Sequence, residues 1–416
     1  MINKLNKLRE LATNELTSRI LPFHMETMMD KQNGGFVGTI SNDLTIDPNA
    51  PKGLVQCGRM LWSYSAAYRH FANEAYLKVA QYAFAELIGR FKDQVNGGFY
   101  WTLDANGDPS DKNKVIYGQA FAIYGLSEYF LATGDDRAQK EAIHLFRLLD
   151  QYAADHQHHG YWEACSETWT PNFEVTVDEI VEPAEKSMNT HLHMLEAYTN
   201  LLRIWDSDTL RLRLFMLIQI HLDYIVDLET AHMNLHFDKD WYSINERFSY
   251  GHDIEASWLL WEAAELLQNQ QLIRRVKPIV LKMAEATLAE GIDIDGGIYD
   301  EAAPGEILSA EKHWWPQAEA MVGFLNAYQL TRNDLYIMAM FECWNFIQTQ
   351  LVDREHGGWI WGIDRSGNPL DREKAGMWKT PYHNGRACLE IIHRVDQLQR
   401  SMTLTEESVD ENLLRF

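Results

Sequence analysis

Four stretches of the sequence place chemically active side chains where a helix is expected to begin. The first runs from Asn189 to His193 and contains His191 and His193. On a strand, two histidines at this spacing could share a metal ion, but on a helix they point about 200° apart. We therefore expect one histidine in a site, the other in a structural role, and no metal ion between them.

The second stretch, Tyr250 to Glu255, carries a histidine and a carboxylate on one helical face. His252 and Glu255 are three residues apart, so the carboxylate can hold the tautomer and orientation of the imidazole. Such pairs are also common as surface salt bridges. The apolar run from Ile254 to Leu267 favours a partly enclosed position, and the segment alone leaves both interpretations open.

The other two stretches are rich in indole side chains. Lys312 to Glu319 contains Trp314 and Trp315 ahead of a proline, a pattern that is more often core packing than a binding platform. Indoles nevertheless suit sugars, because a pyranose face is apolar while its rim needs hydrogen bonds. Met377 to Arg386 joins an indole, two cations and a histidine on a turn before the last helix. A purely structural turn does not need that density of polar groups.

The charge balance argues against polyanionic partners. The 416 residues include 60 acidic and 37 basic side chains, a formal net charge of −23. Such a surface repels phosphate backbones and anionic lipid, so we expect no nucleic acid, no membrane and a small-molecule substrate. No apolar run reaches the ~18–20 residues of a membrane span. Because Met1 to Glu10 lacks the apolar core of a signal peptide, we expect a cytoplasmic protein. We also expect a monomer.

The sequence shows no cofactor motif. Gly34 to Gly38 lacks the strand–turn–helix context of a nucleotide-binding loop. Buried reduced thiols are expected, since no C-x-x-C spacing joins Cys57, Cys165, Cys343 and Cys388. Carboxylates for glycoside cleavage are one interpretation, and a solvated loop the commoner one, for Asp178, Glu179, Glu182 and Glu185. We therefore expect neither a cofactor nor a metal ion.

A glycine–aromatic element recurs along the chain, and Leu235-His236-Phe237 takes its place at the fourth of six positions. Its central positions are 35, 98, 160, 236, 297 and 358, so the steps are 63, 62, 76, 61 and 61 residues. Helical patterns fill the intervals; Asn189 to Trp205, for example, repeats apolar residues every three or four positions. Two helices per repeat give about twelve helices.

Six units of one size close naturally, so the sequence predicts an all-α fold, a single (α/α)6 barrel. Turn sequences such as Asp104 to Pro109 and Asp364 to Pro369 predict short β-hairpins in the loops. No Pro-, Gly- or Ser-rich linker divides the chain, so we expect one catalytic domain over residues 1–416, with a peripheral acidic tail from about residue 404. An open solenoid is the alternative, but its usual period is ~33–47 residues.

Five segments resemble the motifs of the cellobiose 2-epimerases, a family in the N-acylglucosamine 2-epimerase superfamily of (α/α)6 barrels. They are Cys57–Trp62, Asn189–His193, Gly251–Glu255, His313–Gln317 and Trp378–His383. They occur in order, and the resemblance runs from about residue 10 to about residue 395. The last segment is the most specific, because relatives that act on N-acetylglucosamine or free monosaccharides carry different residues around the equivalent histidine.

The resemblance implies a cofactor-independent enzyme that inverts C2 of the reducing-end glucose unit of β-1,4-linked disaccharides such as cellobiose and lactose. It implies that His252 and His383 are the acid/base pair, and that His193 assists ring opening or holds the open sugar. Glu255 would support His252. The residues that the resemblance implies bind or shape the substrate are Arg59, Tyr117, Asn189, Glu255, Trp315 and Trp378.

The chemistry of C2 inversion agrees with these residue types. The C2 hydrogen becomes acidic only when C1 is an aldehyde, so the ring must open before an enediolate forms. One histidine can serve each face, because an imidazole titrates near pH ~6.5 and both accepts and donates protons at neutral pH. Arg59 is a permanent cation suited to the developing enediolate oxygen.

Three other functions remain open on the sequence. A monosaccharide aldose–ketose isomerase or mannose 2-epimerase on the same fold would form the same enediolate. An inverting glycosidase would need two carboxylates ~6.5–9.5 Å apart. A non-catalytic oligosaccharide-binding protein would need the tryptophans but no opposed histidines.

Overall fold

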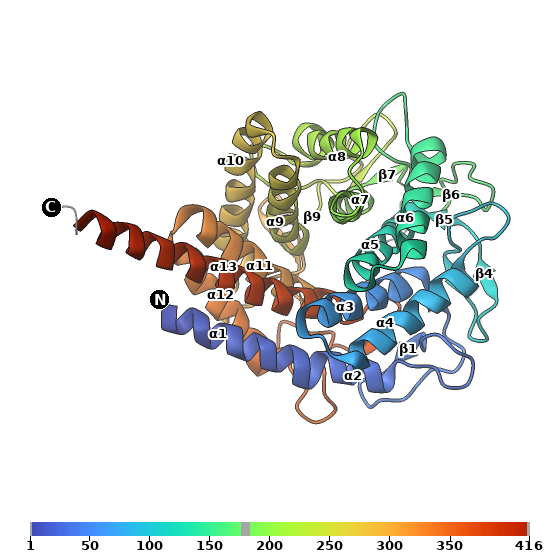
Figure 1. Cartoon of the computed structure of the whole chain (residues 1–416), viewed down its shortest axis with the longest axis horizontal. Helices are drawn as coiled ribbons and strands as arrows, with labels where there is room; N and C mark the ends of the chain where they lie inside the picture. The colour runs from blue at the N-terminus through green and yellow to red at the C-terminus, as the bar shows by residue number, and fades with distance from the viewer. Residues whose placement is uncertain (1, 176–183, 414–416) are drawn as a thin grey trace.

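Six helices form a closed inner ring in the computed structural model, which describes residues 2–175 and 184–413 (Figure 1). They are α3 (Leu54–Phe71), α5 (Ile116–Thr133), α7 (Met188–Leu202), α9 (Tyr250–Leu267), α11 (Trp314–Thr331) and α13 (Tyr382–Leu413). Each helix packs against the next in this order, and α13 packs back against α3, which closes the ring. The prediction of a barrel instead of an open solenoid is confirmed.

A second set of helices surrounds the ring, one against each inner helix. It consists of α1 (Ile2–Glu15) with α2 (Leu21–Thr27), then α4 (Glu74–Glu86), α6 (Asp136–Leu148), α8 (Asp208–Ile220), α10 (Gln270–Ala286) and α12 (Asp334–Phe346). A π-helical turn joins α1 to α2, and a similar turn ends each of the other five. Counting α1 and α2 as one rod, the described residues form twelve helical rods, the number expected. Figure 1 shows α1 beside α13, so the first and last helices are neighbours.

The two ends of the barrel are built differently. At one end α5 passes to α6 through two residues, Gly134 with φ of 70° and Asp135, whose side chain caps the next helix by accepting from the Arg137 amide. Three other links also consist of a residue in the left-handed conformation and then an asparagine that caps the next helix. They are Ala72–Asn73, Gln268–Asn269 and Arg332–Asn333. At the other end the connections are long and carry the strands. Long loops on a rigid scaffold are where binding residues concentrate.

Short antiparallel strand pairs join each repeat to the next. The strand that precedes an inner helix pairs with the strand that follows the turn at the next glycine–aromatic element. In the fourth repeat the turn lies at Ala231, with φ of 64°, and not at residue 236, which belongs to the strand after it. The pairs are β2 (Lys52–Gly53) with β3 (Thr102–Leu103), β5 (Lys114–Val115) with β6 (Ala164–Cys165), β7 (Lys186–Ser187) with β8 (His236–Phe237), β9 (Phe248–Ser249) with β10 (Glu301–Ala303), β12 (Lys312–His313) with β13 (Gly362–Ile363), and β14 (Ala375–Gly376) with β1 (Thr39–Ile40). The last pair joins the final repeat to the first.

The predicted hairpins are present beside these pairs. β3 turns back onto β4 (Pro109–Asp111), and β10 turns back onto β11 (Glu306–Ser309). The second predicted turn closes through a bridge between Ile363 and Pro369. The pairing between neighbouring repeats was not predicted, because a two-residue strand leaves no periodic pattern in the sequence.

A buried lysine at the strand before an inner helix forms an ion pair in five of the six repeats among the described residues. Each lysine bonds an aspartate from the turn that precedes the glycine–aromatic element of its own repeat. The pairs are Lys52–Asp30 at 2.7 Å, Lys114–Asp93 at 2.8 Å, Lys186–Asp155 at 2.8 Å, Lys312–Asp293 at 2.6 Å, and Lys374–Asp353. Burial acts to raise the pKa of Asp93, but hydrogen bonds from Lys114 and from the backbone of the turn outweigh this effect. The pKa of Asp93 is therefore lowered, and the pair stays charged.

The remaining repeat replaces this ion pair with an aromatic stack. Phe248 occupies the lysine position and stacks on His232, with ring centroids 3.7 Å apart. His232 Nδ1 bonds the Asp253 carboxylate of α9 at 2.7 Å. Burial lowers the pKa of His232, but Asp253 more than offsets this and raises it above its usual value. The turn is thus tied directly to the helix that carries His252.

Four further expectations concern the cysteines, membrane spans, the acidic cluster and the C-terminal tail. All four cysteines are buried and unpaired. No helix among residues 2–175 and 184–413 is long and apolar enough to cross a membrane. Of the acidic cluster, Asp178, Glu179 and Glu182 lie outside the described residues. Helix α13 continues to Leu413, so the tail begins as an extension of the last inner helix.

Lys114→Met should lower the free energy of unfolding by about 3–5 kcal/mol, because it leaves Asp93 as a buried charge without a partner. The side chains of both residues are 0% exposed. Urea unfolding followed by circular dichroism would measure the change. Lys7→Met is the matched control and should have little effect, since the Lys7–Glu10 pair is exposed. Equal effects of the two substitutions would contradict the prediction.

Candidate active site

The N-terminal ends of the inner helices open into a cavity of about 250 Å³. Every inner helix contributes a side chain to its wall, and the loop before α13 contributes another. All nine residues predicted as site residues line this cavity: Arg59, Tyr117, Asn189, His193, His252, Glu255, Trp315, Trp378 and His383. Residues up to 324 positions apart in the chain therefore meet at one place, as the motifs predicted.

His191 lies outside the cavity, as the helical geometry required. It is fully buried, and its Nε2 accepts the Tyr161 amide at 2.9 Å while Nδ1 bonds the Ser187 carbonyl at 2.7 Å. Burial lowers the pKa of His191 to about 3, which keeps it neutral. It is the structural member of the pair, and His193 is the one that faces the cavity.

Arg59 is fixed against the cavity wall by its neighbours. Its Nη1 donates to the Trp378 carbonyl at 2.8 Å, and its Nη2 donates to the Tyr117 hydroxyl at 2.7 Å. The guanidinium also lies 4.4 Å from the ring centroid of Phe121. The Arg59 side chain can reach Tyr117 because α3 and α5 pack closely at Gly58. A Cβ at this position would lie only 2.8 Å from the Phe121 carbonyl oxygen. The result is a fixed cation with little conformational freedom.

Two of the four histidines that line the cavity are held by buried carboxylates. His383 Nδ1 bonds Glu319 at 2.7 Å, and His193 Nδ1 bonds Glu196 at 2.9 Å. A carboxylate acceptor places the proton on Nδ1 and leaves Nε2 for chemistry in the cavity. Burial, with the nearby charges of Arg59 and Arg386, lowers the pKa of His383 well below its usual value. His383 is therefore a neutral imidazole at neutral pH, the form that accepts a proton.

His252 and His383 contact the same indole. The Trp315 ring centroid lies 4.6 Å from that of His252 and 5.6 Å from that of His383. Tyr117 and Trp378 pack together at 6.1 Å on another part of the wall. The cavity thus combines imidazoles with aromatic surfaces, the combination that a sugar ring requires.

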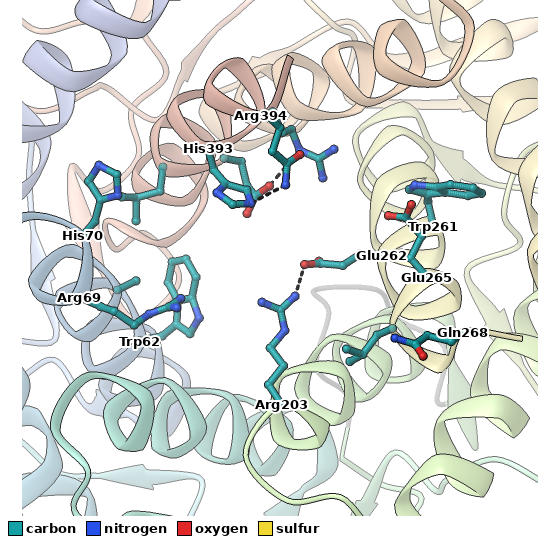
Figure 2. A pocket seen from close by; sticks show the side chains of 15 residues that line it. Trp62, Arg69, His70, Arg203, Trp261, Glu262, Glu265, Gln268, His393 and Arg394 are labelled. Atoms are coloured by element: carbon teal, nitrogen blue, oxygen red, sulfur yellow. Dashed lines mark hydrogen bonds and ion pairs between the residues drawn. The ribbon is translucent and has the colours of Figure 1, made fainter. Parts of the chain in front are cut away.

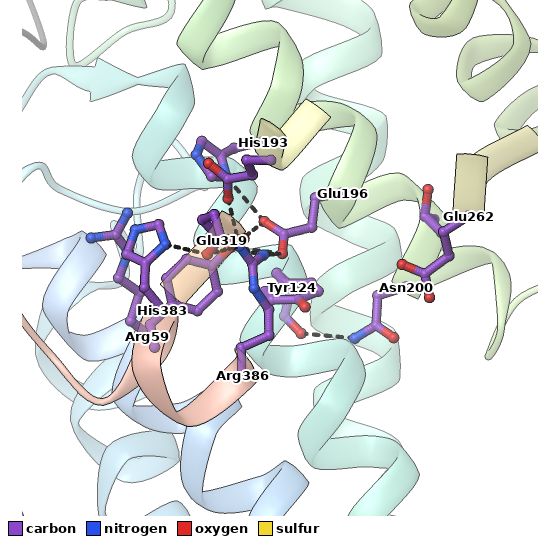
Figure 3. A network of polar contacts seen from close by, with 12 residues as sticks. Arg59, Tyr124, His193, Glu196, Asn200, Glu262, Glu319, His383 and Arg386 are labelled. Atoms are coloured by element: carbon purple, nitrogen blue, oxygen red, sulfur yellow. Dashed lines mark hydrogen bonds and ion pairs between the residues drawn. The ribbon is translucent and has the colours of Figure 1, made fainter. Parts of the chain in front are cut away.

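A buried guanidinium lies beneath these side chains (Figure 3). Arg386, on α13, donates to three carboxylates from three other inner helices: Glu196 of α7, Glu255 of α9 and Glu319 of α11. None of these side chains is more than 3% exposed. The sequence analysis did not predict Arg386, Glu196 or Glu319 as site residues. Charged residues inside apolar helical patterns were the signal that could have found them.

One group of ligand atoms could hold a metal ion. Atoms of Glu255, Glu319 and His383 lie within 4.8 Å of one another. Arg386 donates to both carboxylates, so a permanent cation already compensates their charge. The geometry therefore has no need of a metal ion at this point.

Four further residues line the cavity without having been predicted: His313, Trp314, Trp361 and Arg372. Trp314 and Trp361 pack against each other, with ring centroids 4.5 Å apart. His313 bonds Glu311 at 2.8 Å and lies 3.2 Å from Asp300. These residues extend the aromatic wall toward the loops.

A larger cavity, of about 520 Å³, lies at the opposite end of the barrel (Figure 2). Its arginines are paired with neighbouring carboxylates: Arg203 with Glu262, Arg394 with Glu390 at 2.9 Å, and Arg69 with Glu128 at 2.7 Å. The imidazoles held by buried carboxylates are at the other end.

Comparison with known proteins identifies the family. The family model described as N-acylglucosamine 2-epimerase matches residues 34–387. The cellobiose 2-epimerase of Bacteroides fragilis is 43% identical over 387 residues, covering 92% of this chain and 98% of that protein. The one from Dictyoglomus turgidum is 40% identical, covering 94% and 100%. The structure of the cellobiose 2-epimerase from Bacillus thermoamylovorans superimposes with a TM-score of 0.89 at 38% identity, covering 95% and 100%.

The chain belongs to the N-acylglucosamine 2-epimerase family and, within it, to the cellobiose 2-epimerases. It is accordingly a carbohydrate epimerase, an enzyme of the isomerase class, on an (α/α)6 barrel.

Dialysis against a strong chelator should leave the epimerase activity unchanged, because Arg386 supplies the positive charge beside Glu255 and Glu319. Turnover before and after dialysis is the measurement. A loss of activity that one added divalent ion restores would contradict this prediction.

Proposed function

We propose that this chain inverts C2 of the reducing-end glucose unit of β-1,4-linked disaccharides such as cellobiose and lactose, with neither cofactor nor metal, on one catalytic domain. The observation that carries the proposal is a pair of imidazoles, His252 and His383, against one indole in a cavity that also holds Arg59. The likeness to relatives named cellobiose 2-epimerase supports the choice of substrate.

The reaction begins with ring opening, which exposes the C1 aldehyde and acidifies the C2 hydrogen. His193 assists this step or holds the open chain, with its Nδ1 held by Glu196. One imidazole, His252 or His383, removes the C2 proton and leaves an enediolate. The imidazole on the opposite face returns a proton to C2 and inverts the centre.

Electrostatics favour the enediolate in this cavity. Arg59 is held rigidly by Tyr117 and the Trp378 carbonyl, so its charge needs no reorganisation as the oxygen becomes negative. When His383 accepts a proton at Nε2, Glu319 stabilises the imidazolium that forms through the Nδ1 bond. The neutral resting form of His383 suits it to act as a base.

The aromatic residues supply binding surface for more than one sugar ring. Tyr117, Trp315 and Trp378 present apolar faces for stacking, and Asn189 and Glu255 supply polar groups at the same cavity. A glycosidase function is disfavoured, because the three buried carboxylates of this region, Glu196, Glu255 and Glu319, are all engaged with Arg386. Glycoside cleavage needs carboxylates on both sides of the scissile bond.

Incubation with cellobiose should yield a mannose-ended disaccharide, and the kcat/KM for glucose should be at least about tenfold lower, because glucose leaves much of the stacking surface unused. Chromatography of the products is the measurement. Fructose-ended products would favour an isomerase, released monosaccharide a glycosidase, and binding without turnover a binding protein. Equal efficiency on glucose and cellobiose would remove the disaccharide assignment.

In heavy water the intact enzyme should place deuterium at C2 of both substrate and product. His252→Asn or His383→Asn should abolish inversion, because the second half-reaction then lacks its proton donor. Each variant should still exchange C2 hydrogen in one epimer, glucose-type for one and mannose-type for the other. Mass spectrometry or NMR of the recovered sugars measures this, and a variant that still inverts C2 at a near-normal rate would exclude its histidine.

A further inference from the structure

The three carboxylates around Arg386 receive different numbers of hydrogen bonds. Glu196 accepts from His193, from the Tyr382 hydroxyl at 2.6 Å and from Arg386. Glu319 accepts from three groups as well, namely His383 at 2.7 Å, the Trp258 indole at 3.2 Å and Arg386 at 2.7 Å.

Glu255 is the exception. Its Oε1 accepts from Arg386, and its Oε2 is buried without a hydrogen-bond partner among the described residues. The residue is 0% exposed, so this oxygen is shielded from bulk solvent. An ionised carboxylate in that position would carry a costly unsatisfied oxygen, whereas a protonated carboxyl would not carry full charge there.

The charge count leads to the same residue. Three carboxylates contact the one guanidinium of Arg386, so full ionisation would leave this group of four side chains with two negative charges in excess. Adjacent like charges in a buried site are relieved when one carboxyl keeps its proton. Glu196 and Glu319 have the donors that stabilise an anion, and Glu255 does not.

We propose that Glu255 carries the proton of this cluster and works as a neutral carboxylic acid beneath the substrate cavity. This is the opposite of the carboxylate role that the sequence suggested for Glu255 as a partner of His252. The protonation state itself stands on the buried cluster, and only its catalytic consequence rests on the proposed function.

The electrostatic environment of Glu255 supports the assignment. Burial, and then the charge of Glu319, raise the pKa of Glu255 to about 7, although Arg386 opposes the rise. Burial also raises the pKa of Glu319, while Arg386 and the Trp258 indole oppose the rise. For Glu196, burial acts in the same direction, but Arg386 and His193 lower the pKa to about 2. The titratable or charged groups that face Glu255 are His193, Glu196, Glu319, Tyr382, His383 and Arg386.

The neutral form favours the reaction. The enediolate is an anion formed in the cavity that Glu255 lines, and an ionised Glu255 would add a negative charge beneath it. Because the pKa is raised, Glu255 is protonated below about pH 7 and loses its proton as the pH rises through that value. The rate of epimerisation should therefore fall on the alkaline side as Glu255 ionises.

Glu255→Gln tests the proposal, because glutamine has the shape and neutrality of the protonated acid. We expect kcat at about pH 6 to fall by less than about tenfold, and the decrease between about pH 6 and about pH 8 to disappear. Glu319→Gln is the matched control in the same cluster. It removes the anion that holds His383 Nδ1 and should lower kcat by about 10³-fold or more at every pH. A loss in Glu255→Gln as large as in Glu319→Gln, or an unchanged alkaline decrease, would overturn the proposal.

Thermal unfolding gives a second readout that does not depend on activity. A folded-state pKa raised above the ordinary 4.5 means that stability is fully present below about pH 4.5 and is lost as the pH rises through about 7. The Tm of the intact protein should therefore fall relative to that of Glu255→Gln over this range. Parallel Tm curves would overturn the protonation state, whereas a missing epimerase activity in the intact protein would overturn only the proposed function.

Discussion

The buried guanidinium of Arg386 is the contact on which the centre of the barrel depends. It reaches carboxylates on α7, α9 and α11 from its own place on α13, so four of the six inner helices meet at one charged group. Without it, three carboxyl groups would face one another in a space closed to water, at a cost of several kcal/mol per ion. The inner ring can therefore hold three buried carboxyl groups side by side because the guanidinium of Arg386 lies among them.

The same arrangement fixes the orientation of two cavity imidazoles, His193 and His383. Glu196 and Glu319 are held from below by Arg386 and in turn hold His193 and His383 from below. Each histidine stands near the start of an inner helix, while the anchoring acid of His193 lies one turn further along the same helix. The packing of the helices fixes the carboxylates, and the carboxylates in turn fix the orientation of the imidazole rings. The strand pairs, with their lysine–aspartate bonds, fix the loops that complete the wall.

Sequence patterns predicted much of this, for physical reasons. A repeat of about sixty residues is visible because five of the six repeats carry glycine at the same turn, and it predicted the closed barrel. The nine residues that the resemblance to the cellobiose 2-epimerases implied all line one cavity. Arg386, Glu196 and Glu319 were missed, since their roles arise from contacts between helices up to 190 residues apart. The donors around Glu255, on which the proposal of a neutral carboxyl rests, come from other helices and leave no pattern in the sequence.

The pairing of β14 with β1 has a consequence for how the protein is made. This pair and the contact of α13 with α3 close the ring. The edge of the first repeat therefore stays uncovered until the last repeat has been synthesised. Trp378, His383 and Arg386 also come from the final segment. A nascent chain leaving the ribosome therefore holds most of its helices but has neither a complete catalytic pocket nor a cation among its buried acids. Such long-range closure slows folding and prolongs the exposure of apolar helix faces to chaperones and neighbouring chains.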